Sequence, residues 1–187
     1  MRRDGAVNAI LSQRLEYPPG TYYQYQDDNY QLLAAINEVA SGDKWEDYVA
    51  KELLAPAHMR STGFQGGDWG HKGASGMRST AADIHRWLTA IHEARIFGRT
   101  ESRELESPLM HVRREPPFEI HYGYGTRLYI RGGRVAEVML SGIGDARQSS
   151  IARMLADGTV VIVLSNAGQH RRTTWASYLA QRLVPRK

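Results

Sequence analysis

Apolar residues recur at helical spacing through most of the first hundred positions. The pattern predicts helices over residues 4–15, 28–42, 43–54, 79–97 and, less regularly, 101–111. The helix over 28–42 is the best defined, because one expected buried face carries Leu32, Leu33, Ile36 and Val39. Asp28 is the expected start of this helix, and Gly42 ends it.

Beyond about residue 116 the period of the pattern changes from helical to alternating. Apolar and polar positions alternate from Tyr122 to Ile130 and predict a strand that ends at Gly132-Gly133. Further strands are expected over 134–141, 148–155 and 159–165, followed by a helix over 171–184. Asp157-Gly158 is a strong turn signal between the last two strands. The order predicts an α+β fold in which helices pack on an antiparallel sheet.

One domain accounts for this organisation, with a helical part over about 1–115 and a sheet with its terminal helix over about 116–187. The composition is 42% hydrophobic and 24% charged, which excludes a disordered tail and a membrane-spanning chain. No cysteine occurs, so disulfides and thiolate chemistry are excluded. The N-terminus is too polar for a secretory signal, and the sequence leaves the cellular location open.

Common cofactor and metal motifs do not occur. His92-Glu93 lacks the second histidine of a zinc-protease helix, and Gly142-Ile143-Gly144 has Arg147 where a dinucleotide loop needs glycine. We therefore expect neither a metal nor a cofactor. Glycine is frequent from residue 60 to 78, which predicts a long surface loop of the kind found beside functional sites.

A series of short motifs covers nearly the whole chain. In order they are Pro19-Gly20, Tyr25-Gln26-Asp27, Asn29-Tyr30, Ser41-Gly42, Pro56-Ala57-His58-Met59, the stretch Gly76 to Asp83, Tyr122-Gly123-Tyr124-Gly125 and Leu164-Ser165-Asn166. This order and spacing resemble the superfamily of serine β-lactamases, D-Ala-D-Ala carboxypeptidases and esterases, in its class C-like branch. The resemblance implies an incomplete β-lactamase/transpeptidase-like fold and acyl transfer on a β-lactam, a peptidyl-D-Ala or an ester.

The resemblance also implies residue roles. Tyr25 matches the family tyrosine that moves the proton of the serine nucleophile, and Asp27 matches an asparagine whose amide donates to the substrate. Leu140-Ser141-Gly142 matches a His/Lys-x-Gly strand, and the amide of Ile143 is the implied oxyanion donor. Tyr25 is thus the expected catalytic residue, and Asp27, Ser141, Gly142 and Ile143 the expected substrate-binding residues. Asp27 and Leu140 depart from the pattern, because they supply neither an amide donor nor a charge.

The nucleophile motif of the family, Ser-x-x-Lys, has no match in the expected place. It should lie several elements before Tyr25, and no serine there has a lysine three residues later. Ser41-Gly42-Asp43-Lys44 fits as text, but it falls at an expected turn between two helices. His71-Lys72-Gly73 fits His-x-Gly, but it lies in the glycine-rich loop. We interpret both as chance matches.

Three functions stay open at this point. The first is a portion of a β-lactamase-like serine hydrolase that lacks its nucleophile segment and is inactive alone. The second is a non-catalytic pseudoenzyme or binding protein on the same fold. The third is a basic nucleic-acid-binding module, which rests on a net charge of +4 and ranks last.

The expected partners follow from the first two readings. We expect a pocket for a small-molecule or peptide substrate, no nucleic acid and no membrane segment. In the resembled family, additional strands lie beside the last strand, so strand 159–165 should expose an edge and self-associate.

Overall fold

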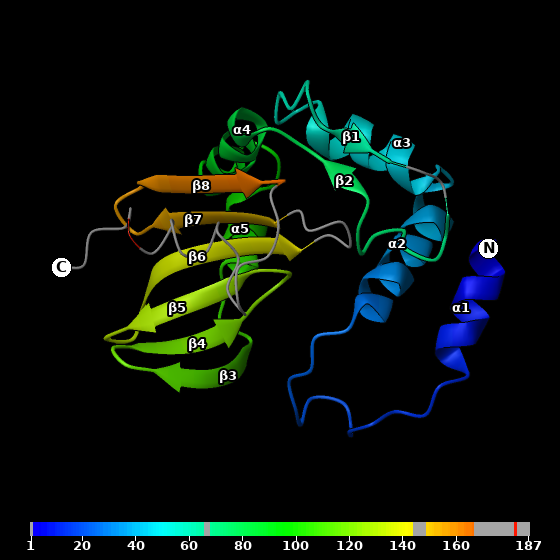
Figure 1. Ribbon diagram of the computed structural model, residues 1–187, viewed down its shortest axis with the longest axis horizontal. Helices are drawn as coiled ribbons and strands as arrows, with labels where there is room; N and C mark the ends of the chain where they lie inside the picture. The colour runs from blue at the N-terminus through cyan, green and yellow to red at the C-terminus, as the bar shows by residue number, and fades with distance from the viewer. Residues whose placement is uncertain (1, 66–67, 144–148, 167–181, 183–187) are drawn as a thin grey trace. The chain divides into compact units, whose positions relative to one another are not determined.

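The computed structural model describes residues 2–65, 68–143, 149–166 and 182. Two compact units divide the chain, Met1–Ser79 and Thr80–Lys187, here called the helical unit and the sheet unit. The elements of each unit are labelled in Figure 1. Helices and antiparallel strands confirm the predicted α+β class. The helix predicted over 171–184 lies outside the described residues.

The described residues of the helical unit contain four helical segments. They are α1 (Arg3–Leu11), α2 (Asp27–Ser41), α3 (Trp45–Val49) and the π-helical turn η1 (Ala50–Leu54), which continues α3. Gly42 ends α2 with a φ of 77°, and its N–H donates to the carbonyl of Glu38 at 3.1 Å. The left-handed conformation costs glycine little, which is why the sequence signal located this helix end correctly.

The buried face of α2 differs from the predicted one. Leu33, Ile36 and Val39 are 59%, 62% and 71% exposed, whereas Ala34 and Ala35 are buried. The two alanines form a core cluster with Ala6 of α1 and with Trp69. Small side chains let a neighbouring helix and an indole ring approach the α2 backbone closely, so packing overrode the hydrophobicity of the larger residues.

The glycine-rich segment over 60–78 contains a short antiparallel pair, β1 (Gly63–Phe64) and β2 (Met77–Arg78). Between these strands the chain packs directly on α2 at Gly73. A Cβ atom at Gly73 would lie 2.5 Å from the carbonyl oxygen of Tyr30 and 2.8 Å from Cβ of Ala34. Gly73 also has a φ of 81°, so both space and backbone conformation require glycine there.

A six-stranded antiparallel sheet forms the centre of the sheet unit, as Figure 1 shows. Its strands follow the chain order: β3 (Met110–Glu115), β4 (Phe118–Tyr122), β5 (Arg127–Arg131), β6 (Arg134–Ile143), β7 (Ser149–Leu155) and β8 (Val160–Ser165). The last three confirm the strands predicted over 134–141, 148–155 and 159–165. Gly132 and Gly133 have φ values of 59° and 75° and form the β5–β6 turn, as expected of a two-residue hairpin.

Two sequence predictions in this unit were wrong. The alternation from Tyr122 to Ile130 is not one strand, because the chain turns between β4 and β5, where the N–H of Gly123 donates to the carbonyl of Thr126 at 2.9 Å. The irregular helix over 101–111 is shorter, α5 (Arg99–Leu105), and β3 follows it. A period of two continues unchanged through a tight turn, so the pattern alone could not locate it.

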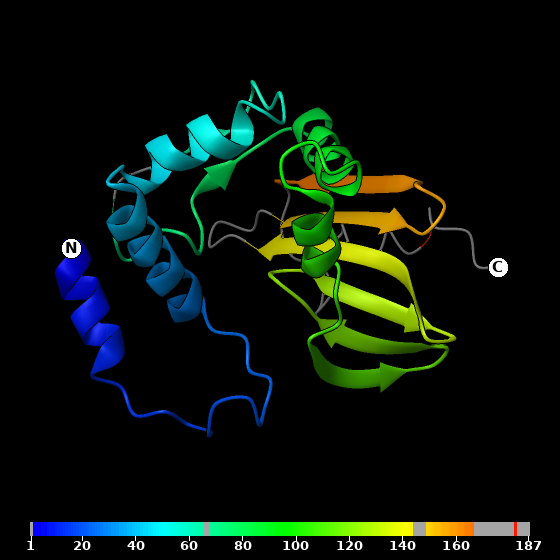
Figure 2. The same cartoon turned by 180° about the vertical axis from the view of Figure 1, so that it is seen from behind.

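The two faces of the sheet carry different apolar clusters. On one face Ala152 and Met154 pack against Leu88 of α4 (Ala81–His92), and Figure 2 shows α4 and α5 in front of this face. Met139 and Ile151 form the core cluster of the opposite face. Alternation along β6 and β7 produces this division, because successive side chains point to opposite sides.

Helix α4 begins as the sequence predicts and ends earlier. The Thr80 hydroxyl accepts a hydrogen bond from the N–H of Asp83 at 3.2 Å and so caps the first turn of the helix. The helix stops at His92 instead of Phe97, and Ala94 follows with a φ of 55°. Among the described residues, no helix is both long enough and apolar enough to cross a lipid bilayer.

Candidate functional site

The chain reaches α2 through an exposed segment that carries the candidate tyrosine. Tyr25 is half exposed, and its ring centroid lies 5.6 Å from that of Tyr30 in the first turn of α2. Gln26 is the N-cap residue and Asp27 the first residue of α2. The extended backbone at Gln26, with φ of −141° and ψ of 131°, lies between Tyr25 and the helical Asp27. Tyr25 therefore lies in the extended segment, and Asp27 lies in the helix.

Asp27 and Asp28 have different surroundings although they are neighbours. The Asp28 carboxylate accepts a hydrogen bond from Nε2 of Gln13 at 3.1 Å. Asp27 is an exposed residue at the beginning of the helix. Asp28 is thus held by the segment before α2, and the Asp27 side chain faces solvent.

The second part of the candidate site is the end of β6. Leu140, Ser141, Gly142 and Ile143 pair in register with β7, from Leu140 opposite Ala152 to Ile143 opposite Ser149. On its other side β6 pairs with β5 only as far as Met139, which lies opposite Arg127. The last four residues of β6 therefore extend beyond β5, and the described residues give that side no strand partner.

Side chains at this end of β6 alternate between the two faces. Leu140 packs against the α4-side cluster that contains Leu88 and Ala152. Ser141 and Gly142 are exposed, and Ile143 is 67% exposed. A Cβ atom at Gly142 would lie 3.0 Å from Oγ of Ser150, so a side chain there would require the Ser150 hydroxyl to move by a few tenths of an ångström. The strand thus presents backbone and small residues where the family pattern expects them.

The predicted site residues form two groups. Tyr25 and Asp27 lie together in the helical unit, and Ser141, Gly142 and Ile143 are consecutive in the sheet unit. That the two groups line one cleft stays a prediction.

The Ser41-Gly42-Asp43-Lys44 match lies at the turn between α2 and α3, as expected. Ser41 is the last residue of α2, and its hydroxyl donates to the carbonyl of Asn37 at 2.7 Å. The N–H of Asp43 donates to the same hydroxyl at 3.2 Å. The chain reverses at Gly42, so Lys44 does not follow Ser41 on one helical turn. This geometry supports the interpretation of the match as chance.

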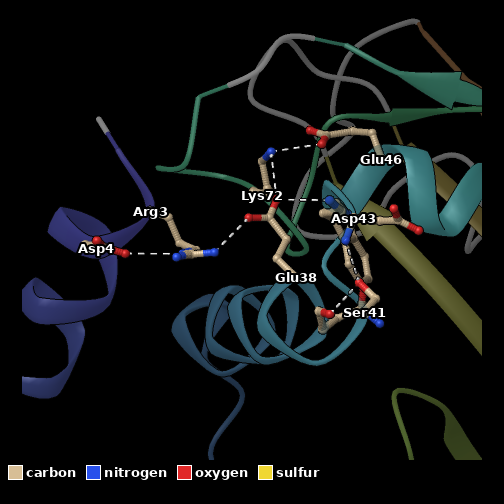
Figure 3. Close-up of polar contacts among 9 residues, drawn as sticks. Arg3, Asp4, Glu38, Ser41, Asp43, Glu46 and Lys72 are labelled. Atoms are coloured by element: carbon tan, nitrogen blue, oxygen red, sulfur yellow. Dashed lines mark hydrogen bonds and ion pairs between the residues drawn. The ribbon is translucent and has the colours of Figure 1, made fainter.

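The His71-Lys72-Gly73 match has a structural role that the sequence did not indicate. Nζ of Lys72 lies 2.8 Å from Oε2 of Glu46 and 3.5 Å from Oε1 of Glu38, as Figure 3 shows. The same ammonium lies 5.0 Å from the centroid of the Trp69 ring. Glu38 also accepts from the N–H of Trp45 at 2.9 Å. This cluster connects the glycine-rich loop with two helices, α2 and α3, that come earlier in the sequence.

A small open pocket of about 90 Å³ lies beside the Lys72 cluster. Its walls come from α3 and from the loop between β1 and β2: Trp45, Glu46, Phe64, Gln65, Asp68, His71, Lys72, Gly73, Ser75 and Gly76. Asp68 belongs to a loop turn, where the N–H of Gly70 donates to it at 2.9 Å and lowers the pKa of its carboxyl. Among the charged lining residues Glu46 and Asp68 are acidic and Lys72 is basic, so the pocket wall has a small net negative charge.

Comparison with known proteins gives a family. A family model described as Beta-lactamase matches residues 2–183. The D-aminopeptidase of Brucella ovis is 27% identical over an alignment of 142 positions, and the match covers 63% of this chain and 27% of that protein. The chain spans 13% of the staphylococcal protein flp, which it also matches, so both relatives are much longer than the matched part.

Solved structures give the fold. The penicillin-binding protein from Bacillus halodurans matches with a TM-score of 0.82 at 16% identity, over 97% of this chain and 62% of that chain. An octameric penicillin-binding protein homologue from Pyrococcus abyssi matches with a TM-score of 0.75 at 19% identity, over 97% of this chain and 51% of that chain. Because the family model extends over nearly the whole sequence, this chain belongs to the beta-lactamase family.

Proposed function

We propose that this chain supplies the tyrosine and the oxyanion strand of an acyl-transfer site, and that the Ser-x-x-Lys nucleophile lies on a segment outside the sequence described here. The substrate is an amide or ester of a D-amino acid, a class that the name of the related D-aminopeptidase suggests. The chain by itself is inactive, because it has the positioning groups without the nucleophile.

The open end of β6 carries this proposal. Leu140 to Ile143 extend beyond β5, so the backbone groups on that side are available to an extended substrate in the described part of the sheet. A peptide or peptide-like substrate gains main-chain hydrogen bonds when it aligns with such an edge. The amide of Ile143 at the end of this edge is the oxyanion donor of the proposed site.

The position of Tyr25 supports the proton-transfer role. A general base must be able to approach the substrate, and the Tyr25 side chain is half exposed immediately before the rigid start of α2. A helix that begins two residues later restricts the backbone of the tyrosine.

A non-catalytic binding protein is the second candidate, and two residues favour it. Asp27 replaces an amide donor by a group that only accepts hydrogen bonds, and Leu140 is packed into the cluster beneath α4. Neither substitution is explained by the loss of the nucleophile segment. A pseudoenzyme that retains the substrate surface for binding would tolerate both.

The test begins with the coding DNA directly upstream. An in-frame Ser-x-x-Lys there supports the proposal, and an in-frame stop codon without it overturns the proposal in favour of the binding protein. The extended protein should then hydrolyse D-alanine p-nitroanilide. We expect Tyr25→Phe to lower its kcat by about 10²-fold or more, since general-base catalysis contributes about 10²- to 10⁴-fold.

Tyr22→Phe is the matched control, because Tyr22 is a similarly exposed tyrosine of the same segment outside the motif. It should retain kcat within about twofold, as expected for a surface change that affects no reacting group. Equal activity of the Tyr25 variant and the control would contradict the role given to Tyr25.

A further inference from the structure

We propose that Tyr30 is a positioning residue, which restricts the side chain of Tyr25 to the rotamer from which its phenol acts. The inference rests on the proposed function, because it deepens the role given there to Tyr25. Both tyrosines belong to the helical unit, so the contact between them lies within one compact unit. Tyr30 acts through Tyr25 and does not itself touch the reacting atoms.

The backbone around Tyr25 leaves its side chain free to rotate. Gln26 is extended and Asp27 begins α2, so the helix sets the main chain that follows the tyrosine. Tyr25 is half exposed, so packing restrains its ring on only part of its surface. Staggered χ1 rotamers lie about 120° apart and would point the phenol in different directions. A proton-transfer group must be held in one of them to act efficiently.

The ring of Tyr30 packs beside the ring of Tyr25. The two centroids lie 5.6 Å apart, and the ring planes are inclined by 39°. Aromatic pairs within about 4.5–7 Å gain stability beyond the burial of area, which favours the paired arrangement by a factor of about 2 to 13. Tyr30 is half-buried, and Tyr25 is exposed. The contact therefore favours one rotamer of the exposed tyrosine.

The glycine-rich loop holds the part of α2 that carries Tyr30. Gly73 packs so closely on this turn that a Cβ atom there would lie 2.5 Å from the carbonyl oxygen of Tyr30. The next residue, Gln31, donates from Nε2 to the carbonyl of Gly70 at 2.9 Å. Two adjacent residues of α2 thus contact the loop. A ring on a backbone supported in this way can restrict a more mobile neighbour, as a positioning residue must.

NMR of the chain tests the contact without any need for activity. The couplings between Hα and the two Hβ protons of Tyr25 report its χ1 rotamer. We expect two unequal couplings in the unchanged chain, because one rotamer dominates. Tyr30→Leu should lower the ratio of the major to the minor rotamers about three- to tenfold and make the couplings similar. Tyr30→Phe should keep them unequal, because its ring preserves the contact.

Hydrolysis of D-alanine p-nitroanilide by the extended protein provides the second readout. Tyr30→Leu should lower kcat about three- to tenfold and leave KM within about twofold, because the contact orients the reacting group and not the substrate. Tyr30→Phe should retain kcat. In a Tyr25→Phe background, Tyr30→Leu should cause no further loss, because no phenol is left to position. A merely structural role would lower kcat in both backgrounds.

Tyr17→Leu is the matched control, because it removes a ring from another tyrosine pair of the same segment. The ring centroids of Tyr17 and Tyr22 lie 4.5 Å apart. This variant should change neither the couplings of Tyr25 nor kcat. Thermal melting followed by circular dichroism establishes that each variant is folded.

The outcomes that overturn the inference differ in what else they reject. If the couplings of Tyr25 stay unequal in Tyr30→Leu, or if Tyr17→Leu equalises them too, Tyr30 does not position Tyr25 and the proposed function stands. The same holds if Tyr30→Phe loses as much kcat as Tyr30→Leu, or if the loss persists in the Tyr25→Phe background. If Tyr25→Phe alone retains kcat, the proposed function fails together with the inference.

Discussion

Gly73 is the residue at which the glycine-rich loop and α2 come closest. Its backbone leaves no room for a Cβ atom beside the carbonyl of Tyr30, and its φ is positive. The contact lets Trp69 and Lys72 reach the buried side of α2, where Glu38 pairs with the lysine. Gly73 is thus a point at which the loop that lines the pocket packs against α2.

Gly73→Ala should lower the free energy of unfolding by about 3 kcal/mol, of which the left-handed backbone accounts for about 1–2 kcal/mol and the clash for the rest. Gly42→Ala is the control, because Gly42 has nearly the same φ of 77° and nothing within 4 Å of a built Cβ. It should cost about 1 kcal/mol. Urea denaturation measures both, and equal losses would show that the Gly73 contact is not tight.

A second prediction concerns the single residue Ser41. We expect no covalent labelling of the chain by a fluorescent penicillin, because its hydroxyl donates to Asn37 and no lysine shares its helical turn. The measurement is gel fluorescence against a heat-denatured sample. Labelling that Ser41→Ala removes would show that Ser41-Gly42-Asp43-Lys44 is a nucleophile motif after all.

The pairing of β6 with β7 carries a buried ion pair. Arg153 of β7 binds Glu137 of β6, and both side chains are buried. The guanidinium also lies 5.4 Å from the centroid of the Tyr129 ring on β5. The three side chains connect three neighbouring strands on the face opposite α4. Removal of one partner would leave the other charged and without water.

Glu137→Leu should therefore lower the free energy of unfolding by about 3 kcal/mol or more. The double variant Glu137→Leu/Arg153→Met should recover most of this loss, since a well-packed apolar pair often equals a buried ion pair in stability. Denaturant titration of the two variants provides the measurement. A double variant that is less stable than the single one would contradict the assignment of the loss to an unpaired buried charge.

Exposed apolar surfaces affect the association of the whole molecule in solution. Strand β8 is the last strand of the described sheet, and its Leu164 is 39% exposed. In the helical unit α2 exposes Leu33, Ile36 and Val39. An uncharged edge strand is a template for pairing with another chain, and exposed apolar side chains favour association.

We expect the isolated chain to self-associate at micromolar concentration, as sedimentation velocity would show. Leu164→Lys should reduce the associated fraction several-fold, because charge on an edge strand opposes strand pairing. Leu109→Lys is the control, since Leu109 is a similarly exposed leucine just before β3, at the opposite edge of the sheet. A monomer that melts cooperatively would contradict the prediction.

The sequence predicted those elements whose signals are local. Gly42 ends α2, Thr80 caps α4, and the glycine pair at 132–133 forms the β5–β6 turn, because each depends on the backbone conformation of a few adjacent residues. The alternating strands β6 to β8 were equally predictable. Tyr25 and the residues at the end of β6 were identified through motif spacing; Tyr25 lies just before α2 and the others lie in β6, and their roles stay predictions.

Only the tertiary structure decided which apolar residues are buried. The helical pattern of α2 favours Leu33, Ile36 and Val39, yet the core contains Ala34 and Ala35 because close approach of α1 and Trp69 needs small side chains. The pairing of Lys72 with Glu38 and Glu46 likewise has no sequence signal, since it joins residues brought together by the packing of Gly73. Adjacent residues determine the local backbone conformation, whereas contacts between distant segments depend on how well the surfaces of those segments fit together.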